Sequence, residues 1–390
     1  MEREKITKRA FIKKSTLGIG ALTFGLNSIN LFGNPFSFFN SNTIPKMLPP
    51  GLDKFSIEAK HWVMTPKGIK CQICPNECKI KTGETGDCRT KTNIDGTLYS
   101  IAYGNPCAVH IDPVEKKPLY HFLPSSKAFS IATAGCNLAC LNCQNWEISQ
   151  ASPTKTRNAD LMPEKVVSQA ITNNCESIAY TYSDPVAFYE YTYDTAKIAR
   201  QKGIKNILVS AGYINEKPLR EWCQYIDAAN IDLKSFSNEI YEMLNAGTLE
   251  PVLNTLKILK EEGIWLEITN LIVPTWNDDM DMIKRMCDWL TSNGFKDTPL
   301  FFSRFHPQYQ LTNLPPTPVS TLTKAREIAI KSGIDFVYIG NVPGSDGENT
   351  YCPNCKNLLI ERKGFRILKN NILNGKCNSC GHSIPGVWEG

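Results

Sequence analysis

The sequence predicts an α/β protein: a partial (β/α)6 barrel flanked by an N-terminal four-cysteine module and a C-terminal module with paired cysteines. Three observations predict this organisation. Apolar runs alternate with helix-forming stretches between residues 126 and 345, which is typical of βα units that build a parallel sheet. A loop with three cysteines follows the first apolar run, and a four-cysteine group lies on each side of the repeating region. A chain of 390 residues is long enough for more than one domain.

The expected strands are short apolar runs bounded by turn or loop signals. They cover residues 129–133, 177–182, 206–210, 230–234, 265–272, 299–305 and 335–340. The expected helices cover residues 185–201, 216–228, 250–262, 278–292 and 320–331. Pro185 lies in the first turn of its helix, and Gly203 and Gly263 end two helices, as these residue types commonly do. The barrel therefore takes residues 126–345, and its chemistry should lie at the carboxyl ends of the strands.

The cysteines indicate metal binding. Eleven of the fifteen fall into three groups, in which most neighbouring cysteines are separated by two or three residues, a spacing that favours metal sites over disulfides. The other four are expected to be buried core thiols: Cys107, Cys175, Cys223 and Cys287.

The middle group, Cys136, Cys140 and Cys143, has the spacing C-x3-C-x2-C directly after an apolar run. Three thiolates can hold one face of a 4Fe–4S cube and leave one iron without a protein ligand. A catalytic metal likewise keeps an open position. The alternative is a structural metal site whose fourth ligand lies elsewhere in the chain.

The N-terminal module, residues 56–125, holds four cysteines, and Gly83 and Gly86 let its loop fold back. Four thiolates suit zinc or a fully ligated iron–sulfur cluster, with a structural or an electron-carrying role. Its ligands are Cys71, Cys74, Cys78 and Cys88.

The C-terminal module, residues 346–390, has two C-x2-C hooks followed or interrupted by turn-forming residues. This pattern predicts a zinc ribbon, a closed structural site. A role in docking a partner or peptide is the alternative. The expected zinc ligands are Cys352, Cys355, Cys377 and Cys380.

The C-x3-C-x2-C loop resembles that of the radical S-adenosylmethionine (SAM) superfamily. The resemblance implies that the open iron binds the amino and carboxylate groups of SAM. It also implies that Tyr182-Ser-Asp-Pro185 corresponds to the Gly-Gly-Glu-Pro stretch that binds the SAM amino group, although the glycines are missing. The residues assigned to this contact are Thr181, Ser183 and Asp184.

The Asp232-Leu-Lys234 segment matches the D-x-K motif of the pyruvate formate-lyase activating enzyme, where the lysine reaches the SAM carboxylate. An ordinary ion pair at the barrel rim is the alternative. Ser210, also assigned to cofactor binding, begins a run that corresponds to Thr-Asn-Gly-Phe in that enzyme. Val209 replaces the preceding aspartate, so the cation site of that enzyme is not expected here.

His306 aligns with a histidine near the substrate of that enzyme, and we expect it to be a proton donor or a substrate contact. A structural role is the alternative.

The order of the three modules, together with Tyr338-Ile-Gly-Asn341, is similar to the radical SAM enzymes of the AmmeMemoRadiSam system. The resemblance implies reductive cleavage of SAM to a 5′-deoxyadenosyl radical that abstracts hydrogen from a partner protein, a peptide or a small molecule. An electron donor such as flavodoxin or ferredoxin is implied as well.

The alternative to an enzyme is a non-catalytic iron–sulfur or zinc protein that carries electrons or acts as a scaffold. No basic stripe interleaved with aromatic residues indicates nucleic-acid binding.

Residues 1–34 are basic at first and then apolar, which predicts a signal-like or anchor segment. The stretch around Lys8 and Arg9 resembles a twin-arginine export signal, with lysine in the first arginine position. SAM is made in the cytosol, so a cytoplasmic or membrane-associated location is favoured over full export. Residues 35–55 are rich in proline and are expected to be a linker.

Overall fold

The computed structural model describes residues 53–389, all of which belong to one compact unit. The predicted signal or anchor segment, and nearly all of the predicted linker, lie outside the described residues. Within the described part of the chain, no helix is both long and apolar enough to cross a membrane.

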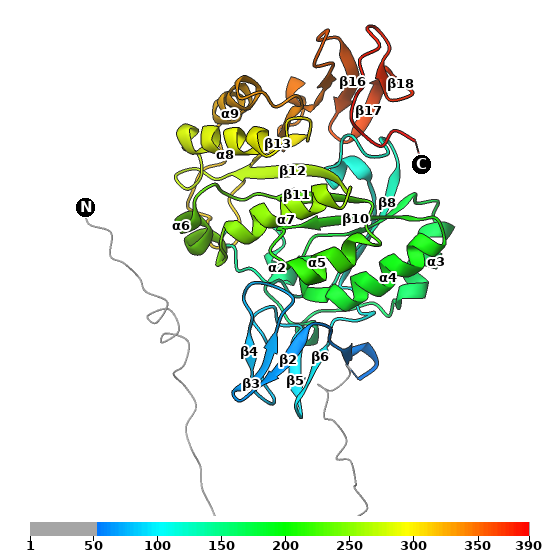
Figure 1. Cartoon of the computed structure of the whole chain (residues 1–390), viewed down its shortest axis with the longest axis vertical. Helices are drawn as coiled ribbons and strands as arrows, with labels where there is room; N and C mark the ends of the chain where they lie inside the picture. Colours follow the sequence, from blue (N-terminus) through cyan, green and yellow to red (C-terminus); the bar gives the residue numbers. More distant parts are fainter. Residues whose placement is uncertain (1–52, 390) are drawn as a thin grey trace, which may run out of the picture. The chain divides into compact units, whose positions relative to one another are not determined.

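The central feature is an eight-stranded sheet whose order is β14-β13-β12-β11-β10-β9-β8-β7 (Figure 1). Seven of its strands are parallel neighbours, and only β7 runs antiparallel, against β8. All seven expected strands are present, and β7 is an additional edge strand. The bounds are β7 Ala108–Pro113, β8 Lys127–Ala132, β9 Ser177–Tyr180, β10 Lys205–Ser210, β11 Ala228–Asp232, β12 Trp265–Ile272, β13 Leu300–Arg304 and β14 Val337–Gly340.

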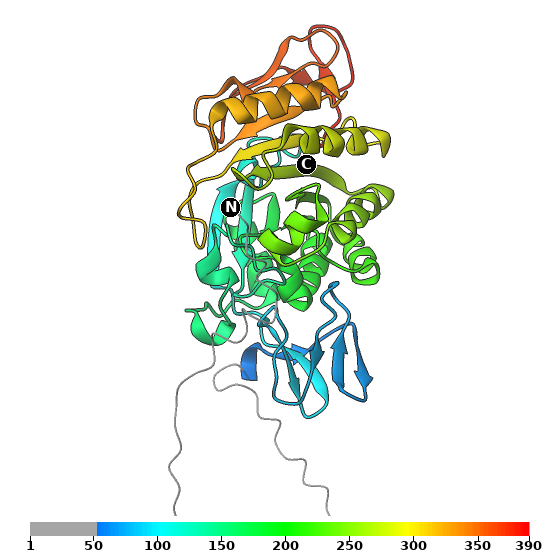
Figure 2. The same cartoon turned by 90° about the vertical axis from the view of Figure 1, so that its left-hand side faces the viewer.

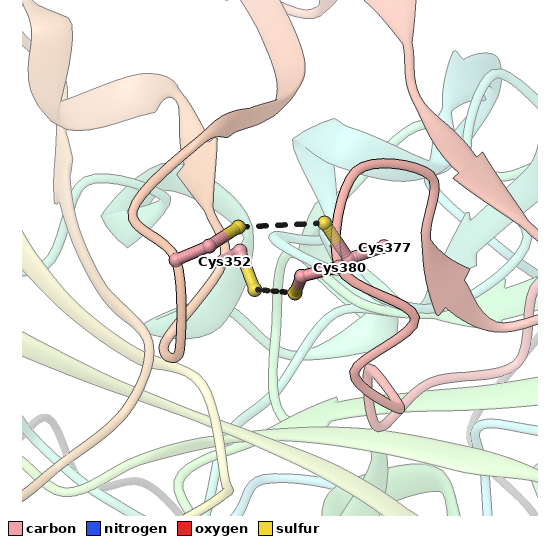
Figure 3. Close-up of side chains that lie close together, drawn as sticks. Cys352, Cys377 and Cys380 are labelled. Atoms are coloured by element: carbon pink, nitrogen blue, oxygen red, sulfur yellow. Dashed lines mark hydrogen bonds between the residues drawn. The ribbon is translucent and has the colours of Figure 1, made fainter.

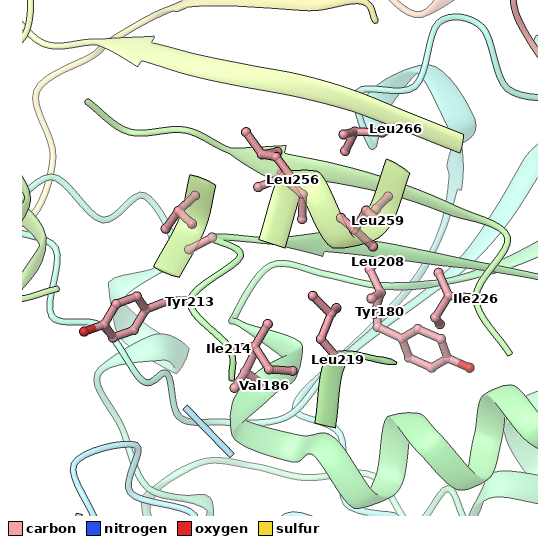
Figure 4. Packing of buried hydrophobic residues seen from close by; sticks show 14 of the residues in the cluster. Tyr180, Val186, Leu208, Tyr213, Ile214, Leu219, Ile226, Leu256, Leu259 and Leu266 are labelled. Atoms are coloured by element: carbon pink, nitrogen blue, oxygen red, sulfur yellow. The ribbon is translucent and has the colours of Figure 1, made fainter. Parts of the chain in front are cut away.

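Helices cover one face of this sheet. Strand residues such as Tyr180, Leu208 and Leu266 pack in one core with helix residues such as Leu219 and Leu256 (Figure 4). The five expected helices are present, and α3 is a sixth that the sequence did not predict. The main helices are α3 Pro163–Thr172, α4 Tyr189–Gln201, α5 Glu216–Cys223, α7 Glu250–Glu261, α8 Met280–Ser292 and α9 Val319–Lys331.

The segment that joins β7 to β8 covers part of the opposite face of the sheet, toward the amino ends of the parallel strands. Small side chains on this face, Ala128, Ala179 and Ala228, leave room for Val114 and Phe122 of that segment. These alanines alternate with the helix-facing residues because successive side chains in a strand point to opposite faces. Helices on one face only, around an open sheet, fit a partial barrel rather than a doubly wound sheet.

The N-terminal module contains two three-stranded sheets, drawn in blue below the barrel in Figures 1 and 2. Lys91 and Glu190, both almost completely buried, form an ion pair that joins this module to α4. Lys91 also donates to the hydroxyl of Ser100 at 3.1 Å. The strands are β1 Ile57–Glu58, β2 Trp62–Thr65, β3 Gly68–Cys71, β4 Lys79–Ile80, β5 Lys91–Ile94 and β6 Thr97–Ser100.

The C-terminal module packs beside β13 and β14. Arg362 is buried, lies 4.1 Å from the centre of the Tyr120 ring, and donates to the Tyr120 carbonyl at 2.9 Å. Phe301 and Tyr338 of the barrel share a core with Leu359 and Ile360 of this module. Its strands are β15 Thr350–Tyr351, β16 Leu358–Lys363, β17 Arg366–Asn370, β18 Ile372–Leu373 and β19 Lys376–Cys377.

We predict that Lys91→Met destabilises the protein by about 3–5 kcal/mol, because it leaves the Glu190 carboxylate buried without its cation. The double variant Lys91→Met/Glu190→Leu should recover much of this loss, since neither charge then remains. Urea denaturation of the metal-loaded protein measures both. The exposed pair of Lys284 and Asp288 provides the control, where Lys284→Met should cost less than about 1 kcal/mol. An equal cost for Lys91→Met and Lys284→Met would contradict the prediction.

Candidate active site

The three-cysteine loop follows β8 and therefore lies at the carboxyl end of a parallel strand, as predicted. Cys136, Cys140 and Cys143 are partly buried, and their sulfurs form no disulfide. Gly135 has a φ of +104°, and a Cβ atom there would lie 2.5 Å from the Cys88 carbonyl oxygen. Glycine is required at this position because it tolerates the backbone angle and the close contact.

Three hydrogen bonds to two other segments of the chain fix the loop. The Asn137 side chain donates to the Tyr213 carbonyl at 2.7 Å, beyond the end of β10. The backbone N–H groups of Ala139 and Leu141 donate to the carbonyls of Asn245 and Leu244 at 3.1 and 2.9 Å. Asn245 ends a short π-helix, Tyr241–Asn245, and π-helical turns often occur at functional sites.

Two of the sulfurs already accept hydrogen bonds. The Asn245 side-chain amide donates to Cys140 Sγ at 3.2 Å, and the Leu138 N–H donates to Cys136 Sγ at 3.4 Å. Burial raises the pKa of both thiols, so a bound cation is needed to keep them as thiolates. Three unpaired thiols with such donors fit the iron–sulfur cluster that the sequence predicts.

Asp184 and Ser210 come together at the ends of neighbouring strands. Ser210 Oγ donates to the Asp184 carboxylate at 3.0 Å, and the N–H groups of Ala211 and Val186 donate to it at 2.9 and 3.0 Å. Burial raises the pKa of Asp184, and these donors oppose the rise. Asp184 also adds to the raised pKa of Cys136, so this carboxyl group faces the cysteine loop.

The neighbouring residues Thr181 and Ser183 are buried just after β9. Ser183 Oγ donates to the Thr133 carbonyl at 2.7 Å, immediately before the cysteine loop. Their predicted contact with SAM stays a prediction, as does that of Asp184 and Ser210.

Lys234 lies just beyond β11. Its ammonium pairs with Asp232 at 2.9 Å, and its backbone N–H donates to the Tyr241 hydroxyl at 3.0 Å. Burial opposes the charge on Lys234, but Asp232 and Cys140 outweigh burial and raise the lysine pKa. The ammonium is therefore close to the cysteine loop, and its side chain remains 21% exposed.

His306 is exposed in the loop after β13, and its role stays a prediction. Two contacts hold this loop against the cysteine loop. Gln310 N–H donates to the Leu141 carbonyl at 3.0 Å, and Tyr309 stacks on Trp146 with ring centres 5.3 Å apart. The sequence did not predict the aromatic pair, although Trp146 follows the last cysteine of the loop by only three residues.

The four C-terminal cysteines form a compact group (Figure 3). Their sulfurs all lie within 4.8 Å of one another, with Cys352–Cys380 and Cys355–Cys377 both at 3.7 Å. Zinc bound tetrahedrally to four thiolates at about 2.3 Å separates the sulfurs by about 3.8 Å. The donor set and its size therefore fit a metal ion such as zinc.

The N-terminal four cysteines lie close enough to influence one another. Burial raises the pKa of Cys74, and the thiols of Cys88, Cys71 and Cys78 raise it further. Between residues 53 and 389, however, only the C-terminal group brings three or more ligand atoms of Cys, His, Asp or Glu within 4.8 Å of one another. Of the four remaining cysteines, Cys107 is partly exposed, whereas the other three are buried as predicted.

Comparisons with known proteins agree with this site. The family model described as Radical SAM superfamily matches residues 130–290, which include the cysteine loop and Lys234. The uncharacterized protein MJ0808 of Methanocaldococcus jannaschii is 48% identical over 321 residues, covering 82% of this chain and 96% of that protein. The pyruvate formate-lyase 1-activating enzyme of Escherichia coli is 24% identical over 164 residues, 41% of this chain and 67% of that enzyme.

Among solved structures, a radical SAM methyltransferase from Sphaerobacter thermophilus aligns with a TM-score of 0.44 at 12% identity, covering 58% of this chain and 71% of that one. This likeness is too weak to add to the argument. The family match, the identity to MJ0808 and the three free cysteines at the carboxyl edge of a parallel sheet lead to one conclusion. Residues 130–290 form a radical SAM superfamily domain, and the chain belongs to one family with MJ0808 and is homologous to the pyruvate formate-lyase activating enzyme.

Proposed function

We propose that this protein cleaves SAM reductively, using a 4Fe–4S cluster held by Cys136, Cys140 and Cys143. The observation that carries the proposal is a lysine ammonium beside three free cysteines at the carboxyl edge of the sheet. When bound, the cluster supplies one electron to SAM, which gives methionine and a 5′-deoxyadenosyl radical that abstracts a hydrogen atom from the substrate.

The residues around the loop would orient SAM. The Lys234 ammonium can pair with the SAM carboxylate, because a charge-assisted hydrogen bond forms readily in a partly shielded site. Thr181, Ser183 and the Asp184–Ser210 pair, at the ends of β9 and β10, would meet the amino group through backbone carbonyls or side chains. Asn245, through its hydrogen bond to Cys140, would favour the thiolate and tune the potential of the cluster.

We further propose a protein or peptide as substrate or partner. Support comes from the homology to an enzyme that, by its name, activates pyruvate formate-lyase.

Within the superfamily we assign the protein to the AmmeMemoRadiSam system, and Tyr338-Ile-Gly-Asn341 supports this assignment. In that segment Asn341 has a φ of +60° and donates to the Arg304 carbonyl, just before His306, the proposed proton donor or substrate contact. A flavodoxin or ferredoxin would supply the electron, and zinc would occupy the C-terminal four-cysteine site.

The alternative is a protein that only carries electrons or holds zinc. Such a protein has no use for an ammonium and a carboxyl group at the strand ends close to the three-cysteine loop. The superfamily match also supports an enzyme.

We predict that the anaerobically reconstituted protein, with dithionite as reductant, releases 5′-deoxyadenosine and methionine from SAM. Cys140→Ala should reduce the release to background, because the cluster then loses a ligand. Liquid chromatography of the quenched reaction measures both products. Cys175→Ala is the matched control, since this buried thiol lies outside all three groups; it should leave the yield unchanged. A wild-type protein with intact clusters that released no 5′-deoxyadenosine would refute the proposal.

We also predict that Lys234→Ala weakens SAM binding by about ten- to a hundredfold, because a charge-assisted contact is worth about 1.5–3 kcal/mol. Lys234→Arg should not restore full affinity, since guanidinium is larger and planar. Calorimetric titration of the reconstituted protein with SAM measures the affinity, and iron analysis checks that the cluster is retained. Lys205 forms a similar pair with Asp227 at the amino end of β10, so Lys205→Ala is the control. Unchanged affinity in Lys234→Ala would remove this lysine from the SAM site.

A further inference from the structure

The two outer cysteine groups differ in how closely their sulfurs approach one another. The C-terminal sulfurs lie within 4.8 Å, whereas no three of the N-terminal ones do. The catalytic loop shares this wider spacing, because the sulfurs of Cys136, Cys140 and Cys143 do not all lie within 4.8 Å of one another either. A single zinc ion needs its four thiolates about 3.8 Å apart. In a 4Fe–4S cluster each thiolate binds a different iron, so the sulfurs stand farther apart.

The N-terminal cysteines lie on a loop that is closed by a backbone hydrogen bond and is shielded from solvent on one side only. Cys71 ends β3, and its N–H donates to the Cys78 carbonyl at 3.0 Å, which closes the loop between them. Gly86 lies against Cys78, where an added Cβ would be 3.6 Å from the sulfur. Cys71 and Cys74 are buried, and Cys78 and Cys88 are partly exposed. One side of the site is thus shielded and the other is open toward solvent.

The same module contacts the catalytic cysteine loop directly. Asn76, between the second and third cysteines, donates to the Asn137 carbonyl at 2.7 Å, next to Cys136. The carbonyl of Cys88 touches Gly135 on the other side of Cys136. Two points of the four-cysteine segment, Asn76 and Cys88, therefore meet the residues that flank the first catalytic cysteine.

Three further hydrogen bonds join the N-terminal module to the barrel. The backbone N–H of Asn215 donates to the Ile73 carbonyl at 2.9 Å, and its side chain donates to the Gln72 carbonyl at 2.8 Å. Arg89 donates to the Gln150 side chain at 2.9 Å. A metal site that only stabilised the module would not need to be fixed against the catalytic loop in this way.

We propose that the N-terminal four-cysteine site holds a second 4Fe–4S cluster, with every iron ligated by protein, and that this cluster passes electrons to the catalytic loop. The external donor is a reduced flavodoxin or ferredoxin, which gives one electron to the N-terminal cluster at its partly exposed side. That cluster then gives the electron to the oxidised cluster of the loop and returns to its own oxidised state, and no bond forms or breaks. Metal binding at this site does not depend on SAM cleavage, whereas the relay role rests on the proposed function.

The first test is a metal count on the anaerobically reconstituted full chain. The wild type should contain about eight irons and eight sulfides, with about one zinc from the C-terminal site. Cys71→Ser/Cys74→Ser should lose about half of the iron. A triple alanine variant of Cys136, Cys140 and Cys143 should keep the other half and give an electron paramagnetic resonance signal that SAM does not change. Cys175→Ala, the control, should keep the full count.

A second zinc in place of iron in the triple variant would overturn the inference, even if the wild type cleaves SAM. A wild type that contains both clusters but does not cleave SAM would instead overturn the proposed function and leave the second cluster in place.

The relay is tested by rapid mixing with reduced flavodoxin, following the reduction of each cluster by freeze-quench resonance spectroscopy. In the wild type the N-terminal signal should appear before the catalytic one. Cys71→Ser/Cys74→Ser should lose the fast reduction of the catalytic cluster. Equally fast reduction in that variant, with its catalytic cluster intact, would refute the relay.

Discussion

The hydrogen bonds that fix the cysteine loop after β8 are the constraint on which the rest of the site depends. A loop with three thiolates can hold a cluster only if its backbone keeps the sulfurs apart and on one side. Here Asn137 fixes the loop to the end of β10, and Ala139 and Leu141 fix it to the π-helix. Because these anchors belong to different parts of the sheet edge, the loop takes its shape from the folded barrel rather than from its own sequence.

The parallel sheet explains why distant residues meet at this loop. Strands β9, β10 and β11 are neighbours, so Asp184, Ser210 and Lys234, which follow or end them, reach the same edge. Helices pack against one face of the sheet, and the β7–β8 segment packs against the other face toward the amino ends of the strands. The polar groups are thereby concentrated at the carboxyl ends, where barrel enzymes place their chemistry.

The sequence was sufficient to predict the seven parallel strands, because each is a short apolar run bounded by turn- or loop-forming residues. It also identified the three cysteine groups and the residues at the strand ends, since these depend on local spacing and on strand order. It did not predict β7, an antiparallel edge strand that ends in Pro113, because alternation along its six residues is weak. The contact of Asn245 with Cys140 was also missed, since it joins residues 105 positions apart through a π-helix. The stack of Trp146 on Tyr309 depends in the same way on two loops meeting in the folded chain.

The central claim is that the catalytic loop leaves one iron open for SAM, and electron paramagnetic resonance of the reduced protein tests it most directly. The account predicts that adding SAM shifts the spectrum of the catalytic cluster, because the amino and carboxylate groups bind the open iron. Adenosine, which lacks both groups, should leave the spectrum unchanged. A wild-type spectrum that SAM does not alter, in protein with its full iron content, would contradict the account.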